Sequence, residues 1–359
     1  MKLNVNTRLF QTLVSKSMKC ASCIADTPIT GMMAIEVKDN VLTLTTTNEN
    51  TYLYVNAPCT NEDFYVVVEV EVFSKLIAKL TSESMSLELV KDTLVVHANG
   101  KYTIGLPYDS EGELVKFPDR RDKLNTDDRT TTKVNLSTLR LILATAKASL
   151  DTTKNYYGCY TGYYLGDKVV ATDSYKICMI KTKVFDTPVL VRSEMMDLVE
   201  LLEDEDVEVV KNNDYIMFST DKCTIFGQVL PFLEDFQIDA ISELCEQKFN
   251  HSCQIEKGSI LSLLDRLSLF VTKVDENGIL LDFDDMGIRV TSKQDDSTEL
   301  IHYVSVDIPK NFSCCVDIEK FADQIKSTMA DTVELYFGED NALKIVDGNV
   351  IKIIALFEQ

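Results

Sequence analysis

The sequence predicts an α+β protein of three repeated domains, each with two helices packed on antiparallel sheet. The first observation is a stretch of alternating apolar and polar residues from Ser84 to Pro107, which Lys91-Asp92 and Asn99-Gly100 interrupt. Alternation with such breaks is typical of a three-stranded antiparallel meander that buries one face.

The second observation is that this meander pattern occurs three times. Its start at Met85 has an equivalent 122 residues later at Val207 and another a further 126 residues on, at Val333. A recurring spacing of this size indicates repeated domains, and 359 residues are more than one apolar core usually holds. We expect domains at residues 1–120, 131–242 and 250–359.

In each repeat the expected order is a strand, a helix, four strands, a second helix and the meander. Polar residues predict linkers between the repeats, at Pro118–Thr132 and Ser242–Phe249. The helices are expected where apolar residues recur at helical spacing, which they do in residues 7–19, 71–82, 137–150, 192–202, 259–273 and 317–329.

The composition indicates packed cores and no membrane segment. Apolar residues make up 45% of the chain, no apolar run reaches transmembrane length, and the start MKLNVNTRLF lacks the apolar centre of a signal peptide. The ten cysteines have irregular spacings, which favours reduced thiols over disulfides. We therefore expect a cytoplasmic protein that does not bind membranes.

The net charge of −21 argues against nucleic-acid binding over the whole surface. The six predicted helices together carry +4, so the rest of the chain carries −25. Exposed helix faces collect lysines in many proteins, and for any single helix that explanation suffices. For the set, a positive layer of helices on a negative body favours contact with phosphates.

Cys20 and Cys23 form a CxxC pattern that suggests a metal or redox site. A structural zinc needs four ligands, but there is no second CxxC, and the histidines His97, His251 and His302 are scattered. A redox CxxC opens a helix, whereas this one lies where a helix should end. We expect no metal, no cofactor and no enzymatic activity; the alternative is a hydrolase or metal enzyme with converging acids and histidine.

Three short motifs, DTPITGMMAIEV, VVATDSYKI and LPFLEDFQ, occur in this order along the chain. They resemble the "PI" turn and strand, the "ATDGHRL" segment and the "FPDY" region of one family, the bacterial-type DNA sliding clamp, the beta subunit of DNA polymerase III. The resemblance covers essentially the whole chain. It implies a head-to-tail homodimer that closes into a ring around duplex DNA, and a role in DNA replication as a processivity factor that binds the replicative polymerase and the clamp loader.

The resemblance implies a partner-peptide pocket between the second and third domains. The matching positions are Thr172, Ser174, Tyr175, Lys176, Ile177, Glu234, Asp235, Phe236, Ile353, Ala355, Leu356 and Phe357. Ser174 replaces the family's glycine, and Tyr175-Lys176 replaces its His-Arg. The altered pocket favours two alternatives, a non-replicative scaffold and an inhibitor-resistant variant clamp. A further alternative is that Tyr175 and Phe357 pack on each other and simply close the domain junction.

The resemblance also implies a subunit contact and a DNA-facing surface. The contact would join Phe270-Val271 to the edge strand that carries Lys101 and Thr103, although ordinary core is the competing explanation for the apolar pair. Ile24 stands where the family usually has an arginine. The DNA-facing positions are Arg8, Lys16, Lys75, Lys79, Arg140, Lys147, Tyr156, Tyr157 and Arg266.

Overall fold

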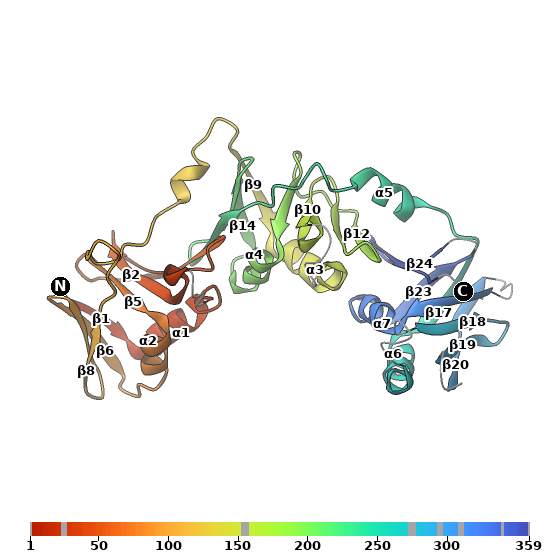
Figure 1. Ribbon diagram of the computed structural model, residues 1–359, viewed down its shortest axis with the longest axis horizontal. Coiled ribbons are helices and arrows are strands. Elements are labelled where there is room, and N and C mark those ends of the chain that lie inside the picture. Colours follow the sequence, from red (N-terminus) through yellow and green to blue (C-terminus); the bar gives the residue numbers. More distant parts are fainter. Residues whose placement is uncertain are drawn as a thin grey trace. The chain divides into compact units, whose positions relative to one another are not determined.

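The computed structural model describes residues 2–22, 27–151, 158–271, 278–292, 297–307, 312–338 and 341–357 (Figure 1). The chain divides into two compact units, a first unit of Met1–Arg140 with Glu194–Val229 and a second unit of Leu141–Ser193 with Leu230–Gln359. The division runs through the middle repeat, so each unit joins part of that repeat to one of its neighbours. The boundaries of the three domains stay a prediction.

All three repeats have the expected order of elements. The first repeat contains β1 (Lys2–Asn6), α1 (Thr7–Ser17), β2 (Met32–Lys38), β3 (Val41–Thr47), β4 (Thr51–Pro58), β5 (Phe64–Glu69), α2 (Val70–Ala78), β6 (Ser84–Val90), β7 (Thr93–His97) and β8 (Lys101–Gly105). The second contains β9 (Thr130–Asn135), α3 (Leu136–Ala146), β10 (Gly162–Leu165), β11 (Val169–Thr172), β12 (Lys176–Ile180), β13 (Val189–Arg192), α4 (Ser193–Asp197), β14 (Asp206–Lys211), β15 (Tyr215–Ser219) and β16 (Cys223–Gln228). The third contains β17 (His251–Glu256), α6 (Lys257–Leu267), β18 (Gly278–Phe283), β19 (Gly287–Ser292), β20 (Thr298–His302), β22 (Phe312–Asp317), α7 (Ile318–Lys326), β23 (Thr332–Phe337), β24 (Ala342–Asp347) and β25 (Val350–Ala355).

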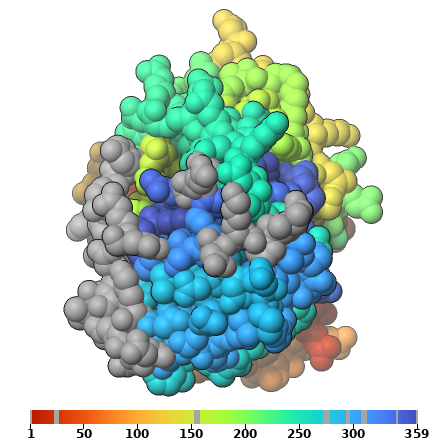
Figure 2. All heavy atoms as spheres, turned by 90° about the vertical axis from the view of Figure 1, so that its right-hand side faces the viewer, coloured from red at the N-terminus to blue at the C-terminus, as the bar shows by residue number. Residues whose placement is uncertain are grey.

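Two elements lie outside the expected order. The third repeat has a fifth strand between its two helices, the short β21 (Ser305–Asp307), which pairs with β17. The helix α5 (Ile238–Glu246) occupies much of the stretch expected to be the second linker, and it packs against β12 and β25. Figure 2 shows the green segment that contains α5 lying against the dark blue strands near the C-terminus.

The sheets are antiparallel and follow one plan in every repeat. The first strands β1, β9 and β17 pair with the first meander strands β6, β14 and β23. The other strands of each repeat form a group of four, in the orders β5-β2-β3-β4, β13-β10-β11-β12 and β22-β18-β19-β20. The predicted α+β class, with helices packed on antiparallel sheet, is confirmed.

Neighbouring repeats are joined through strand pairing. At the first junction, in the first unit, β4 pairs with β16, which makes one eight-stranded sheet from β5 to β9. At the second junction, in the second unit, β12 pairs with β25 within a nine-stranded sheet from β13 to β21. The strands of the middle repeat are thus divided between the two sheets. Strands β9 and β14–β16 belong to the eight-stranded sheet, and β10–β13 belong to the nine-stranded sheet.

The helices of the outer repeats pack in pairs. In the first repeat α1 and α2 lie side by side (Figure 1), and the ring of Phe10 meets that of Phe73 edge-on, with centroids 6.1 Å apart. Phe10, Leu13 and Val14 are buried at the spacing of one helical face. In the third repeat α6 and α7 share one apolar core with the strands. Within the described residues, none of the helices has the length and apolar character needed to cross a membrane.

Candidate functional site

The turn between β11 and β12 carries the first group of predicted pocket residues. Oγ1 of Thr172 accepts a hydrogen bond from the N–H of Ser174 at 3.0 Å. Oδ1 of Asp173 accepts from the N–H groups of Tyr175 and Lys176 at 2.9 and 2.6 Å. These bonds hold Ser174 at a φ of 78°, in the left-handed region that favours glycine. The serine therefore keeps the backbone conformation for which glycine is best suited.

Three apolar residues of the predicted pocket are buried in one cluster. Ile177 on β12 pairs with Ile353 on β25, and both belong to one buried apolar cluster with Phe236. The ring of Phe236 stacks on Tyr164 at 5.3 Å and meets Tyr160 edge-on at 5.6 Å. The structure thus brings these residues together as a buried floor, while Glu234 and Asp235 in the preceding turn are exposed.

The exposed part of the predicted pocket is formed by Tyr175 and the end of β25. Tyr175 is 50% exposed, and its carbonyl accepts a hydrogen bond from the N–H of Ala355 at 2.8 Å. Nζ of Lys320 on α7 lies 4.6 Å from the centroid of the Tyr175 ring. Leu356 and Phe357 are half-buried, and Leu356 packs against the core of the third repeat. Lys320 was not predicted, because helical residues of another repeat give no local sign of this contact.

The ammonium group of Lys176 lies inside the second unit, to which this residue belongs. Its Nζ donates a hydrogen bond to the carbonyl of Ala148 at 2.6 Å and lies 3.5 Å from Oδ2 of Asp173 and 4.0 Å from Oδ2 of Asp323. The residue is buried. The ammonium group that reaches the rim beside Tyr175 is therefore that of Lys320.

A second buried lysine lies at the junction of β12 and β25. Lys352 is fully buried, is the cross-strand partner of Cys178, and donates hydrogen bonds to the carbonyl of Gln324 at 3.0 Å and to Oγ of Ser327. Loss of hydration lowers the pKa of Lys352 from 10.5 to about 8. Nε2 of Gln324 in turn donates to Oγ of Ser149 at 2.8 Å, so a polar chain crosses the second junction.

The residues predicted for the subunit contact lie on the end strand β8 and just after helix α6. Lys101 and Thr103 are exposed on β8, the end strand of the described sheet β1-β6-β7-β8. Phe270 is 43% exposed, whereas Val271 is half-buried and packs against the core of the third repeat. The core explanation therefore fits Val271 and does not fit Phe270. Leu300, which was not predicted, is 40% exposed on the end strand β20.

The basic residues predicted to face DNA differ in their surroundings. Arg8, Lys79 and Lys147 are exposed. Arg140 is exposed too, and its Nη2 donates a hydrogen bond to the carbonyl of Leu202 at 3.1 Å. Tyr156 and Tyr157 lie outside the described residues.

Three of these basic residues have carboxylate partners. Lys16 pairs with Glu203, which also accepts a hydrogen bond from Lys222 at 3.1 Å. Lys75 pairs with Glu71 at 2.8 Å along α2. The guanidinium of Arg266 makes two hydrogen bonds to Glu299 on β20, one of them 2.9 Å from Nε to Oε1, and this pair lowers the pKa of Glu299. The predicted cations are thus unequally available to a phosphate.

The cysteine motif does not form a reactive thiol at Cys20. This residue is buried, its Sγ donates to the carbonyl of Thr51 at 3.3 Å, and burial raises its pKa to about 12. Cys23 lies outside the described residues. Within the part of the chain that the structure describes, no three His, Cys, Asp or Glu residues group together in a way that could hold a metal ion.

The arrangement of strands and helices is that of the DNA sliding clamps. The chain matches the DNA polymerase beta subunit from Streptococcus pyogenes with a TM-score of 0.84 and 16% identity over 100% of both chains. It matches the DNA polymerase sliding clamp from Bacillus subtilis (TM-score 0.85, 14% identity, 100% of this chain and 99% of the other) and the DNA polymerase III subunit beta from Pseudomonas aeruginosa (0.85, 14%, 100% of both). No protein-family model and no curated protein matches the sequence. The similarity establishes the fold that the motifs predicted.

Proposed function

We propose that this protein is a sliding clamp, a ring of two copies that encircles duplex DNA and holds a replicative polymerase on it. The observation that carries the proposal is that equivalent strand edges are joined in two pairs within the chain, whereas β8 and β20, the edges of a third such pair, are both open in the described sheets. The shared fold supports it, since the matched structures are described as DNA polymerase sliding clamps and beta subunits.

Equivalent strands make both junctions. Strands β4 and β12 end their groups of four, and each pairs with the last meander strand of the following repeat, β16 or β25. The same position in the third repeat is β20, and the last meander strand of the first repeat is β8; both are end strands of the described sheets. A second copy that places its β8 beside β20 continues the pattern. Two copies joined head to tail then leave neither edge open.

The side chains around β20 suit an interface. Leu300 on this strand is 40% exposed, and Leu269 and Phe270 after α6 are 81% and 43% exposed. The bidentate pair of Arg266 with Glu299 ties the end of α6 to β20, so these apolar groups are held near one edge. Exposed apolar groups beside an unpaired strand edge favour association with another chain.

In this proposal the helices meet the phosphates of DNA without reading bases, which allows sliding. Tyr175 and the end of β25 bind short peptides of the polymerase and of the clamp loader, with Lys320, whose Nζ also pairs with Oδ2 of Asp317 at 3.1 Å, placed to meet a carboxylate or carbonyl. A clamp of this kind works in the cytoplasm, has no chemical reaction of its own and needs no cofactor.

The decisive test is topological. The protein is diluted until it dissociates, concentrated again with closed circular duplex, and passed through a gel-filtration column in high salt. A ring stays with the circle, and cutting the circle once with a restriction enzyme releases it. Retention that is unaffected by the cut, or no retention at all, contradicts the proposal.

The interface is tested by variants at the β20 edge. Phe270→Ala with Leu300→Asp should give monomers in sedimentation equilibrium while the circular dichroism stays that of the wild type. Met329→Asp is the matched control, because Met329 is 62% exposed in the same repeat and its N–H bonds to Asp347 at the end of β24, in another sheet than β20. A double variant that remains dimeric would place the contact elsewhere.

The partner site is tested by calorimetry with peptides derived from replicative polymerases. Tyr175→Ala should weaken peptide binding at least tenfold, because it removes the exposed aromatic wall, and deletion of Leu356–Gln359 should abolish binding. The dimer mass should persist in both variants. Peptide affinity equal to that of the wild type in both would show that the pocket is not at this turn.

A further inference from the structure

The helix pairs of the first and third repeats each leave a groove, and the two grooves differ in charge. In the first repeat two adjoining depressions of about 580 and 650 Å³ follow α1 and the C-terminal half of α2. In the third repeat one depression of about 320 Å³ lies between α6 and α7. Because the helices occupy the same places in the repeat, the comparison isolates the effect of their side chains.

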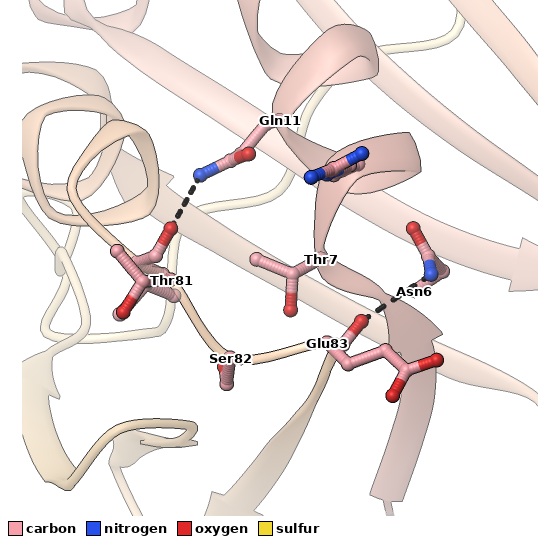
Figure 3. A pocket seen from close by; sticks show the side chains of 8 residues that line it. Asn6, Thr7, Gln11, Thr81, Ser82 and Glu83 are labelled. Carbon is pink, nitrogen blue, oxygen red and sulfur yellow. Dashed lines mark hydrogen bonds between the residues drawn. The ribbon is translucent and has the colours of Figure 1, made fainter.

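The first depression surrounds the start of α1 (Figure 3). Its lining is made mostly of hydroxyl and amide groups with one guanidinium and one carboxylate, and the residues are Asn6, Thr7, Arg8, Gln11, Leu80, Thr81, Ser82 and Glu83. Nε2 of Gln11 donates hydrogen bonds to the carbonyls of Ile77 and Leu80 at 2.9 and 3.0 Å. Gln11 thus ties α1 to the end of α2, and since it also lines the second depression, the two adjoin.

The second depression lies farther along α1. Lys19 and Lys75 face it together with the hydroxyl groups of Ser15 and Ser74 and the apolar side chains Val14, Met18, Ile77 and Ala78. No carboxylate belongs to its lining. Lys75 pairs with Glu71, but both side chains are about 70% exposed, at 69% and 74%. Pairs so exposed are weak and open readily to another anion.

The groove of the third repeat has the opposite character. Asp265, Glu319 and Asp323 line it, against one ammonium group from Lys326. The neighbouring Arg266 is engaged by both oxygens of Glu299. A phosphate brought to this groove meets an excess of negative charge.

We propose that the groove of the first repeat, formed by Asn6–Lys19 and Ser74–Glu83, binds the phosphodiester backbone, and that the groove of the third repeat does not. The three cations Arg8, Lys19 and Lys75 outnumber its one carboxylate, Glu83. Lysine, arginine, serine, threonine and glutamine are the groups that hold backbone phosphates in protein–DNA complexes, and this groove combines them. This inference rests on the proposed function for its ligand, and of the two outer repeats it assigns the DNA contact to the first. Arg266 then belongs to the edge of β20 and not to the DNA surface.

The test compares two variants that each remove two positive charges. One is Lys19→Gln with Lys75→Gln, and the matched control is Lys326→Gln with Arg289→Gln, since the exposed Arg289 on β19 belongs to neither the groove nor the β20 edge. Binding to a fluorescent duplex of about 30 base pairs is followed by anisotropy from about 0.05 to 0.3 M KCl. Each lost phosphate contact lowers the slope of log Kd against log salt by about one. The first variant should therefore lose about two in slope and bind about tenfold more weakly near 0.1 M salt, while the control stays within twofold of the wild type.

Three results would overturn the inference. They are equal losses in both variants, a first variant that binds like the wild type, and a wild type without measurable binding up to about 100 µM. The proposed function is tested separately, since retention on closed circles depends on ring closure and not on which repeat touches phosphate. A wild type that is trapped on circles while the first variant keeps full duplex affinity contradicts this inference alone.

Discussion

The two junctions between repeats have the same strand pairing but are covered by different chemistry. At the first junction the rings of Tyr52 and Tyr54 on β4 and Phe226 on β16 share one face of the sheet. At the second, Ile177 on β12 and Ile353 on β25 occupy the corresponding face. In both cases the segment that links the repeats crosses this face.

The first junction is covered by the linker before β9, which contains the short 3-10 helix η2 (Arg121–Leu124). The guanidinium of Arg121 lies 4.5 Å from the ring centroid of Tyr54, and Arg120 lies 5.6 Å from that of Tyr52. Leu124 is buried in the same aromatic cluster. This linker is therefore bound by cation–aromatic contacts that remain close to solvent.

The second junction is covered by α5, which packs through Ile241 and Cys245 on the cluster that contains Phe236. The opposite side holds the buried polar chain of Lys352, Gln324 and Ser149. Strand pairing therefore sets the geometry of a junction, while the segment that covers it determines which conditions weaken it. Salt and surface mutations should act on the first junction, and core truncation and pH on the second.

The largest effect is expected from Phe236→Ala. Removing a ring that packs on Tyr160 and Tyr164 should cost about 3–5 kcal/mol. Hydrogen exchange should speed up in β12 and β25 and stay unchanged in β4 and β16. Phe236→Leu keeps much of the apolar volume and should recover most of the loss. Equal acceleration at both junctions would mean that they do not unfold separately.

A pH effect should also be confined to the second junction. The pKa of Lys352 is about 8 in the folded protein and 10.5 ordinarily, so between these values the unfolded chain binds more protons and stability rises with pH. Between pH 7.5 and 9.5 the gain should be about 2 kcal/mol, measured by urea unfolding with fluorescence or exchange probes in β25. Lys352→Met should remove this dependence. A slope that persists in the variant would assign it to another group.

At the first junction a smaller loss is expected from Arg121→Gln. A cation–aromatic contact of this kind contributes about 1 kcal/mol when it is partly exposed, and the loss should appear in urea unfolding followed in β4 and β16. Arg129→Gln is the matched control, since Arg129 in the same linker donates to Oδ1 of Asn125 at 3.0 Å. Similar losses in the two variants would show that general charge, and not the Tyr54 contact, holds the linker.

The repeat pattern explains how much of this architecture the sequence could predict. The three meanders were predicted because alternation and turn residues are local signals, and their recurrence fixed the order of elements. The helix α5 was missed although Ile238, Ile241 and Cys245 have helical spacing, because the repeat has no helix at that place. Lys352 could not be predicted as buried, since a lysine in an alternating strand indicates a solvent-facing position, and β12 and α7, which help to bury it, are distant in the sequence.

For the sites, too, the sequence identified residues in motifs and missed those marked only by their place in the repeat. The resemblance grouped Thr172, Ile177, Phe236 and Ile353. In the structure Ile177, Phe236 and Ile353 share one cluster, and Thr172 is the cross-strand partner of Ile177. The two strand edges β8 and β20 are equivalent only by their place in the repeat. Comparing the repeats element by element would have singled out Leu300, which no motif marks.

The smallest expected effect comes from a turn that both junctions share, although its two sequences, TNENT and TDSYK, differ. In the first repeat Oγ1 of Thr47 accepts from the N–H of Glu49 at 3.0 Å, as Thr172 does from Ser174. Glu49 has a φ of 85° and Ser174 a φ of 78°. The carbonyl of Asn50 accepts from the N–H of Gln228 at 3.1 Å, as that of Tyr175 does from Ala355.

Both turns therefore place a residue with a side chain in the left-handed region, which costs about 1 kcal/mol relative to glycine. Glu49→Gly should stabilise the first junction and Ser174→Gly the second by about this amount, each seen as slower hydrogen exchange in its own pair of strands. Glu49→Ala and Ser174→Ala are the controls, because alanine keeps the strained conformation and should give no gain. If alanine stabilises as much as glycine, the gain comes from removing the side chain and the two turns are not strained. If only one glycine variant gains stability, the junctions differ in the turn as well as in the segment that covers them.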